Sequence, residues 1–259
     1  MNVFLLYHKC ASQWTKNVFR QLAGIKNEFL YMGNREPEKG NGVLQNDKIE
    51  NYPTLRNKKI YITDVKFPGV GMWENINVED KKFKSLFPPI SNTVTIIRDP
   101  RDILISGYYS HKKSHPVIEG MWKDLPVQRS VLLKLNTEEG LLSTIDFLAY
   151  QFNNLKHLYK SKVTFFLFED IVDNPYKLVK NILNVWDIKA TNINIKKVVD
   201  KFSFENLKSG KTKTPPFDSD HYRSSITGEW KDVLSEKVLN KFHKKYPNLI
   251  DEYEKIKSK

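Results

Sequence analysis

Short apolar runs alternate along this chain with stretches of helical periodicity, and this alternation restricts the possible folds more than any other feature. Four runs rich in β-branched or aromatic residues are typical of buried strands: Val3–Tyr7, Lys59–Asp64, Thr93–Arg98 and Lys162–Phe168. Helices are expected from Ser12 to about Leu22, from Pro100 onwards behind an Asp99 N-cap, and over Ser143–Tyr159, Tyr176–Val185 and Glu236–Phe242. The order of strands and helices predicts an α/β fold, one domain over residues 1–259 with a central parallel sheet flanked by helices on both faces.

Two polar stretches interrupt this pattern. Asn34–Asn57 and Lys208–Ser225 are broken by glycine and proline, so each predicts a long loop. Long loops inside compact domains often close over a ligand, and residues 208–225 are therefore predicted to form a lid. Internal repeats and linker-like composition are missing from the sequence, which favours a single domain.

Composition limits the classes of function. The formal net charge of +12 favours a polyanionic ligand or an anionic cofactor, or else a solvated lysine-rich surface. The sequence has no zinc-finger spacing, RNP-like motif or basic zipper, so nucleic acid is not an expected partner. Cys10 is the single cysteine, and no stretch approaches the roughly 20 apolar residues that span a bilayer. We expect a cytoplasmic protein without a membrane partner, and the sequence leaves its oligomeric state open.

The segment YHKCASQWTKNVF, residues 7–19, follows the first predicted strand and leads into the first predicted helix. Backbone N–H groups at such a turn bind anions, and Lys9, Ser12 and Thr15 add one charge and two hydroxyl groups. A kinase-type P-loop, G-x-x-x-x-G-K-[ST], needs glycines and a Lys-Ser/Thr pair that this segment lacks. The segment therefore predicts phosphate binding without ATP hydrolysis, against the alternative of an ordinary strand-to-helix turn.

A second candidate anion site lies in TIIRDPRDILISGYYSHKKSH, which begins at Thr95. Arg98 ends a predicted strand, where open α/β sheets bind ligands. Ser106 lies about two turns into the following helix, so both side chains can face one anion. The alternative is that Arg98 pairs with Asp102 and that Ser106 is merely exposed.

A third candidate segment, YRSSITGEWKD, begins at Tyr222 at the end of the predicted lid. Arg223 is a bidentate phosphate donor by type, and Gly228 permits a tight turn. The alternative is a loop held in place by a buried Trp230.

Together these segments resemble the signatures of the sulfotransferases that use 3′-phosphoadenosine 5′-phosphosulfate (PAPS). Their first signature, P-K-S-G-T-T-W, is matched at Lys9 and Trp14. Their second, R-[ND]-P-[KR]-D-x-x-x-S-x-Y, is matched at all of its specified positions: Arg98, Asp99, Pro100, Arg101, Asp102, Ser106 and Tyr108. Their third, R-K-G-x-x-G-[DE]-W-K, is matched at five positions: Arg223, Gly228, Glu229, Trp230 and Lys231. FEDIVDNP is similar to the family's Y-E-D-x-x-x-x-P, so four segments occur in family order.

This resemblance implies a P-loop-like domain, PAPS as co-substrate, 3′-phosphoadenosine 5′-phosphate (PAP) as product, and no metal. It implies that Lys9 contacts the 5′-phosphate and the bridging oxygen, where it acts in catalysis. The same phosphate is expected to be surrounded by Cys10, Ala11, Ser12, Gln13, Trp14 and Thr15. The 3′-phosphate is expected to be held by Arg98, Ser106 and Arg223, with Ser224 and Ser225 contributing from the lid. The adenine is expected against Phe168, Ser203, Phe204 and Leu207.

The chain departs from the family pattern at both phosphate segments. Ala11 replaces the family glycine and Cys10 a serine in the first signature. In the third, two serines replace Lys-Gly, which removes a positive charge that Lys211 and Lys213 can supply instead.

Sulfuryl transfer also needs a base for the acceptor proton. Many family members place a histidine in K-[ST]-H-L-P, where alignment on Pro68 puts Lys66. Glycan sulfotransferases place a glutamate in K-E-V-x-F, and that register puts Asp64 at the position. Asp64 is therefore the predicted base, Lys66 is predicted to act with it on the sulfuryl group, and His111 and His115 are alternatives.

The predicted acceptor is a small molecule that presents a hydroxyl or, less readily, an amine. Its pocket is expected from Asn34–Asn57, Phe67–Asn75, Gly107–Trp122 and the lid. The compact form resembles bacterial and cyanobacterial enzymes, including those that sulfate guanidinium alkaloids of the saxitoxin type. The alternatives are a glycan or lipid sulfotransferase and, from other classes, a nucleotide-kinase-like phosphotransferase or a non-catalytic anion- or nucleic-acid-binding protein.

Overall fold

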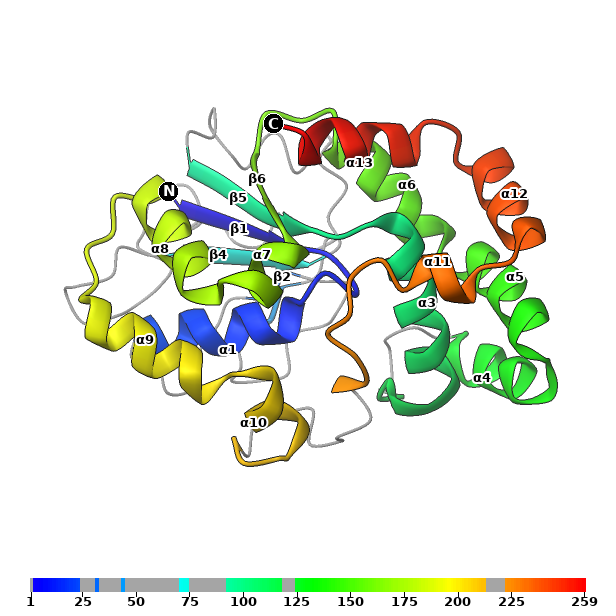
Figure 1. Ribbon diagram of the computed structural model, residues 1–259, viewed down its shortest axis with the longest axis horizontal. Coiled ribbons are helices and arrows are strands. Elements are labelled where there is room, and N and C mark those ends of the chain that lie inside the picture. The colour runs from blue at the N-terminus through cyan, green and yellow to red at the C-terminus, as the bar shows by residue number, and fades with distance from the viewer. Residues whose placement is uncertain are drawn as a thin grey trace. The chain divides into compact units, whose positions relative to one another are not determined.

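The computed structural model describes residues 2–23, 31–32, 43–44, 70–74, 92–117, 124–212 and 222–259. The chain divides into two compact units (Figure 1). The sheet unit comprises Met1–Ile97 and Ser161–Ser203, and the helical unit comprises Arg98–Lys160 and Phe204–Lys259. Among the described residues, no helix is long and apolar enough to cross a membrane.

The sheet unit is built on a six-stranded sheet in the order β3-β2-β4-β1-β5-β6, and its pairings are all parallel. The strands are β1 Asn2–Leu6, β2 Tyr31–Met32, β3 Val43–Leu44, β4 Val70–Glu74, β5 Asn92–Ile97 and β6 Thr164–Leu167. β1 lies between β4 and β5, and its Phe4 and Leu5 are buried. An apolar run without alternation suits a strand covered on both faces. The predicted α/β fold class is confirmed.

Three of the four predicted strands are confirmed as β1, β5 and β6, whereas Lys59–Asp64 lies outside the described residues. β4, which pairs with β1, was not predicted, because VGMWE contains a glycine and ends in an acid. The loop predicted over Asn34–Asn57 contains the two-residue strand β3. A strand of this length has no periodicity from which it can be recognised.

Four helices of the sheet unit are described: α1 Ser12–Ala23, α7 Phe168–Asp173, α8 Pro175–Val185 and α9 Asn192–Lys201. α1 packs against α9, and α8 packs against β5. The rings of Phe4, Phe19 and Trp186 meet in tilted or edge-on contacts with centroids 5.4 to 5.8 Å apart. This aromatic contact joins β1 to α1, the two elements that flank the turn, and also to the end of α8.

The helical unit is arranged around α3 Pro100–Tyr109, which contacts α5, α11 and α13. Its other described helices are η3 Ser110–Ser114, α4 Leu125–Lys134, α5 Thr137–Phe147, α6 Ala149–Leu158, α10 Phe204–Lys208, α11 Trp230–Val233, α12 Glu236–Lys245 and α13 Leu249–Lys257. The predicted start of α3 is confirmed, since the Asp99 side chain accepts a hydrogen bond from the Arg101 N–H at 2.9 Å. α3 continues directly into η3, a π-helical turn.

The single helix predicted over Ser143–Tyr159 is wrong. The chain breaks at Leu148, which ends α5 and begins α6 with φ −88° and ψ 13°. Ile145, Leu148 and Phe152 are all buried, so the apolar pattern continues across the break. Periodicity reports which face is buried and does not detect a change of backbone angle at one residue.

Candidate active site

The turn between β1 and α1 has an unusual backbone. Lys9 and Ala11 adopt φ of 64° and 58°, a left-handed conformation that side chains with a Cβ rarely take. The Cys10 N–H donates to the Tyr7 carbonyl at 3.1 Å, and the Thr15 N–H donates to the Ala11 carbonyl at 3.0 Å. Positive φ values alternating with ordinary ones are typical of backbone turns that gather N–H groups around an anion.

The side chains of this turn differ in burial. Cys10, Trp14 and Thr15 are buried, whereas Lys9, Ala11, Ser12 and Gln13 are partly exposed. The Thr15 hydroxyl lies in the first turn of α1, and among the described residues it has no hydrogen-bond partner. A buried hydroxyl without a partner costs free energy unless a ligand or water satisfies it. The residues present therefore fit an anion held at this turn.

In the helical unit, one stripe of α3 organises the second candidate site. Asp102, Ser106 and Tyr109 occupy positions i, i+4 and i+7 of α3 and therefore share one face. Asp102 is buried, and Ser106 and Tyr109 are partly exposed.

Asp102 anchors the segment that carries the third signature. Its Oδ2 accepts from the Gly228 N–H at 2.7 Å, and its Oδ1 accepts from the Trp230 N–H at 3.0 Å. Burial raises the pKa of Asp102 above its ordinary value, while these hydrogen bonds and the charge of Arg98 act in the opposite direction. Gly228 has φ 76°, so only glycine fits this tight turn without strain.

Arg223 lies at the other end of the same stripe. Its guanidinium is 4.3 Å from the centroid of the Tyr109 ring. Its Nη1 and Nη2 donate to the two carboxylate oxygens of Glu229, at 2.7 and 2.5 Å. The segment from Arg223 to Trp230 therefore runs along α3 from Tyr109 to Asp102, and Ser106 lies between the two contacts.

Arg98 reaches the same segment from the start of the helical unit. It is 5% exposed, and its Nη2 lies 3.4 Å from the Ile226 carbonyl oxygen, to which it donates. The positive charge of Arg98 opposes the rise in the pKa of Asp102 that burial causes. Arg98 therefore contacts the segment that carries Arg223, and Ser106 lies on the face of α3 that carries Asp102 and Tyr109.

Arg101 braces this arrangement. Its guanidinium lies 3.6 Å from the centroid of the Trp230 ring, and it pairs with Asp99 at 2.6 Å and with Glu254 of α13 at 2.9 Å. Trp230 is thus held by a cation–π contact as well as by its backbone bond to Asp102.

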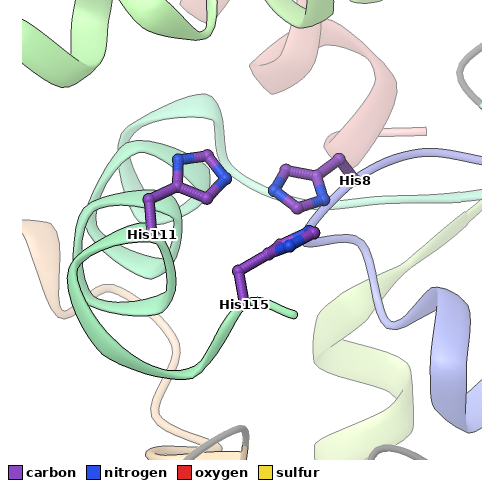
Figure 2. Close-up of side chains that lie close together, drawn as sticks. All are labelled: His8, His111 and His115. Carbon is purple, nitrogen blue, oxygen red and sulfur yellow. The ribbon is translucent and has the colours of Figure 1, made fainter. Parts of the chain in front are cut away.

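A histidine pair occupies η3 and its C-terminal end. The rings of His111 and His115 lie close together in an edge-on arrangement, with centroids 5.4 Å apart (Figure 2). His111 is fully buried, with its ring 5.1 Å from that of Phe147. Arg129 of α4 donates to the backbone carbonyls of His111 and His115, at 2.9 and 2.5 Å. These bonds satisfy carbonyls that the end of a helix leaves open.

The residues predicted near the adenine belong to both units. Phe168, at the start of α7, and Ser203, after α9, are in the sheet unit, whereas Phe204 and Leu207 of α10 are in the helical unit. At the end of the segment predicted to form a lid, the Ser224 hydroxyl accepts from the Ile226 N–H at 3.0 Å. The predicted catalytic residues Asp64 and Lys66 lie outside the described residues, as do Lys213 and Trp122.

The predicted phosphate ligands divide between the units. Lys9 to Thr15 belong to the sheet unit, and Arg98, Ser106 and Arg223 belong to the helical unit. Motif matching assigned no role to Asp102, Tyr109 or Glu229, although Asp102 and Glu229 stand inside matched signatures. For Asp102 and Glu229, the signal in the sequence was an acidic residue among the basic residues of a predicted anion site.

The family model that describes the sulfotransferase domain matches residues 78–256, more than half of the chain. The chain therefore belongs to the sulfotransferase family, as the signatures indicated, and is a sulfotransferase by class. Sulfotransferase 6B1 of gorilla and of human are each 23% identical over 239 residues, covering 90% of this chain and 71% of each relative.

Two solved structures share the fold. A mouse sulfotransferase, SULT7A1, solved with PAP, superposes with a TM-score of 0.58 at 16% identity and covers 99% of this chain and 87% of its own. Retinol dehydratase, solved with androsterone and the inactive cofactor PAP, superposes with a TM-score of 0.50 at 13% identity and covers 96% of this chain and 80% of its own. These likenesses agree with the α/β fold of the sheet unit.

Proposed function

We propose that this protein moves a sulfuryl group from PAPS to a hydroxyl group of a small molecule. The observation that carries the proposal is the segment from Arg223 to Trp230, pinned to α3 by Asp102 and Tyr109. Arg98 donates to Ile226 of this segment, and the proposal is that Arg98, Arg223 and Ser106 supply the donors that bind a phosphate monoester. PAP in two structures of the same fold supports a 3′-phosphorylated nucleotide as the ligand.

The turn between β1 and α1 is proposed to hold the 5′-phosphate. Its N–H groups, the start of α1 and the unsatisfied Thr15 hydroxyl offer donors, and Lys9 offers a full charge. This turn lacks the glycines and the Lys-Ser/Thr pair of a kinase-type loop. Magnesium-dependent phosphoryl transfer is therefore the less favoured alternative.

When bound, PAPS supplies an activated sulfuryl group whose departure leaves negative charge on a phosphate oxygen. We propose direct in-line transfer: the acceptor oxygen bonds to sulfur as the sulfur–oxygen bond to the 5′-phosphate breaks. Lys9 is proposed to stabilise the charge on the bridging oxygen, and the acceptor proton passes to a base. Asp64 remains the proposed base, with Lys66 beside it and His111 and His115 as alternatives.

The acceptor is proposed to be a small molecule. Retinol dehydratase, which shares the fold, was solved with androsterone, and this supports a small molecule as the acceptor. A guanidinium alkaloid stays among the proposed acceptors, because Asp64, Glu74 and Asp124 offer carboxylates that suit a cation. A glycan or lipid acceptor is the alternative within the class.

Incubation with PAPS and a panel of hydroxyl-bearing small molecules, with PAP formation as the readout, tests the proposal. Lys9→Ala is expected to lower kcat about a hundredfold, corresponding to roughly 3 kcal/mol of lost transition-state stabilisation. Lys196→Ala, which removes an exposed lysine of the same unit, is the matched control and should leave kcat unchanged. Acceptor-dependent PAP formation that survives Lys9→Ala at full rate would refute the role of Lys9. Magnesium-dependent turnover of ATP would instead favour the phosphotransferase alternative.

A further inference from the structure

The guanidinium of Arg223 is held from two directions within the helical unit. The Tyr109 ring lies against it, 4.3 Å from ring centroid to guanidinium carbon, and this contact fixes the plane of the group. The carboxylate of Glu229 takes both terminal nitrogens, at 2.7 and 2.5 Å, and this pair fixes the rotation within that plane. An arginine side chain otherwise has many rotamers, so two such contacts greatly reduce its freedom.

The ion pair leaves most of the donor capacity of Arg223 in place. A guanidinium has five N–H donors, and the two bonds to Glu229 use two of them. Among the described residues, Arg223 donates only to Glu229. The remaining N–H groups, in a fixed plane, suit a tetrahedral phosphate that accepts along one edge of the guanidinium.

Tyr109 is itself fixed by its neighbours. Its ring packs edge-on against Tyr108, with centroids 4.9 Å apart. Tyr108 is 1% exposed, and its hydroxyl accepts from Lys112 Nζ at 3.0 Å. Gly140 of α5 makes room for this ring, because a Cβ there would lie 2.4 Å from Tyr108 Cε2. The Tyr109 ring under Arg223 is therefore backed by Tyr108, which belongs to the packed interior between α3 and α5.

We propose that Tyr109 is a positioning residue for the 3′-phosphate, acting through Arg223. The proposal rests on the function proposed above, in which Arg223 binds that phosphate. Tyr109 holds the guanidinium in its binding orientation before the nucleotide arrives, so binding does not have to order a mobile side chain. Tyr109 makes this contribution to nucleotides with a 3′-phosphate and not to those without one.

Substituting Tyr109 tests the positioning of Arg223 more cleanly than substituting Glu229. Removing the charge of Glu229 would release Arg223 and would also remove a negative charge near the phosphate, and these two effects on affinity have opposite signs. Tyr109 is neutral, so Tyr109→Leu removes the aromatic face without changing the charge of the site. Tyr109→Phe keeps the face and removes only the hydroxyl.

The experiment is calorimetry of PAP and of AMP, which lacks the 3′-phosphate, with the full-length protein and its variants. Tyr109→Leu should weaken PAP about three- to tenfold and leave AMP unchanged, and Tyr109→Phe should stay within about twofold for both. In an Arg223→Ala background, Tyr109→Leu should cause no further loss, because its effect passes through Arg223. Tyr150→Leu, at an exposed tyrosine of α6, is the control for loss of a ring elsewhere.

The outcomes distinguish the positioning role of Tyr109 from the 3′-phosphate role of Arg223 on which it rests. If Arg223→Ala weakens PAP but Tyr109→Leu does not, the role of Tyr109 is refuted and the 3′-phosphate role of Arg223 stands. An equal loss of PAP and AMP affinity in Tyr109→Leu, or a loss that persists without Arg223, would also refute positioning. If Arg223→Ala binds PAP as the unaltered protein does, the 3′-phosphate assignment itself is wrong, and the Tyr109 proposal is overturned with it.

Discussion

Asp102 accepts a hydrogen bond from the backbone of Gly228 at 2.7 Å, across 126 positions of the chain. The bond joins the second signature, which includes α3 residues, to the third signature, which is far away in sequence and lies beside α3. It also explains why an acid stands among the basic residues of a predicted phosphate site. The Asp102 carboxylate binds the backbone that carries Arg223 and does not face the nucleotide in this account.

Asp102→Asn is expected to weaken PAP about tenfold while leaving AMP affinity unchanged. An asparagine accepts through one oxygen only, and its amide would face the second backbone N–H, so one of the two anchors is lost. Calorimetry with both nucleotides measures the effect. Asp146→Asn, which removes a carboxylate paired with Lys241 on the exposed side of α5, is the matched control. Equal weakening of both nucleotides would contradict a role confined to the 3′-phosphate.

The same residue predicts a pH dependence of stability. Because burial raises the pKa of Asp102 in the folded state, the folded protein holds this proton more tightly than the unfolded chain. The contribution of Asp102 to the free energy of unfolding is therefore complete below the unfolded pKa of about 4 and is lost as the pH rises through the folded pKa. Urea unfolding from pH 4 to pH 7 should show the stability of the protein relative to Asp102→Asn falling with pH. A difference that grows with pH would show that the pKa is lowered instead.

Ala11→Gly should stabilise the protein by about 0.5–1 kcal/mol. Relief of the left-handed conformation is worth about 1–2 kcal/mol, and the greater freedom of glycine in the unfolded chain offsets about 0.4–1 kcal/mol of it. Ala149→Gly, in the ordinary backbone of α6, should destabilise and serves as the control. Thermal or urea unfolding measures both. Destabilisation by Ala11→Gly would argue against the positive φ of 58° at this residue.

The sequence predicted the turn but not its conformation. The run before Lys9, the start of α1 at Ser12 and the position of the charge were all readable, because apolar runs and helix starts depend on local composition. The left-handed backbone at residue 11 could not be predicted, because glycine is the residue that indicates a positive φ and alanine stands there. Two-residue strands and the break at Leu148 were missed because they are set by pairing and by one backbone angle.

The candidate site also has residues that the sequence predicted and contacts that it did not. Arg98, Ser106 and Arg223 were predicted as phosphate ligands from motifs, because arginine and serine side chains donate hydrogen bonds to phosphate, and they stay predictions. The contacts of Tyr109, Asp102 and Glu229 depend on which side of α3 the distant segment lies along, and only the folded chain shows this. The predicted base, Asp64, stays a prediction.

The lid prediction has a direct test by limited proteolysis. If Lys208–Ser225 closes over the nucleotide, trypsin cleavage at its lysines should slow when PAP is added, because binding lowers the population of open states. AMP should protect less, since Arg223 is proposed to bind the 3′-phosphate. Cleavage at the same rate with and without PAP would contradict closure by the nucleotide.

The central claim is that this chain clamps a nucleotide phosphorylated at both its 3′ and 5′ positions. Calorimetry of PAP against AMP on the unaltered protein tests it most directly, with Lys9→Ala and Arg98→Ala as the paired variants. The account predicts tight binding of PAP alone, abolished in Lys9→Ala and weakened in Arg98→Ala. Equal affinity for PAP and AMP would contradict it.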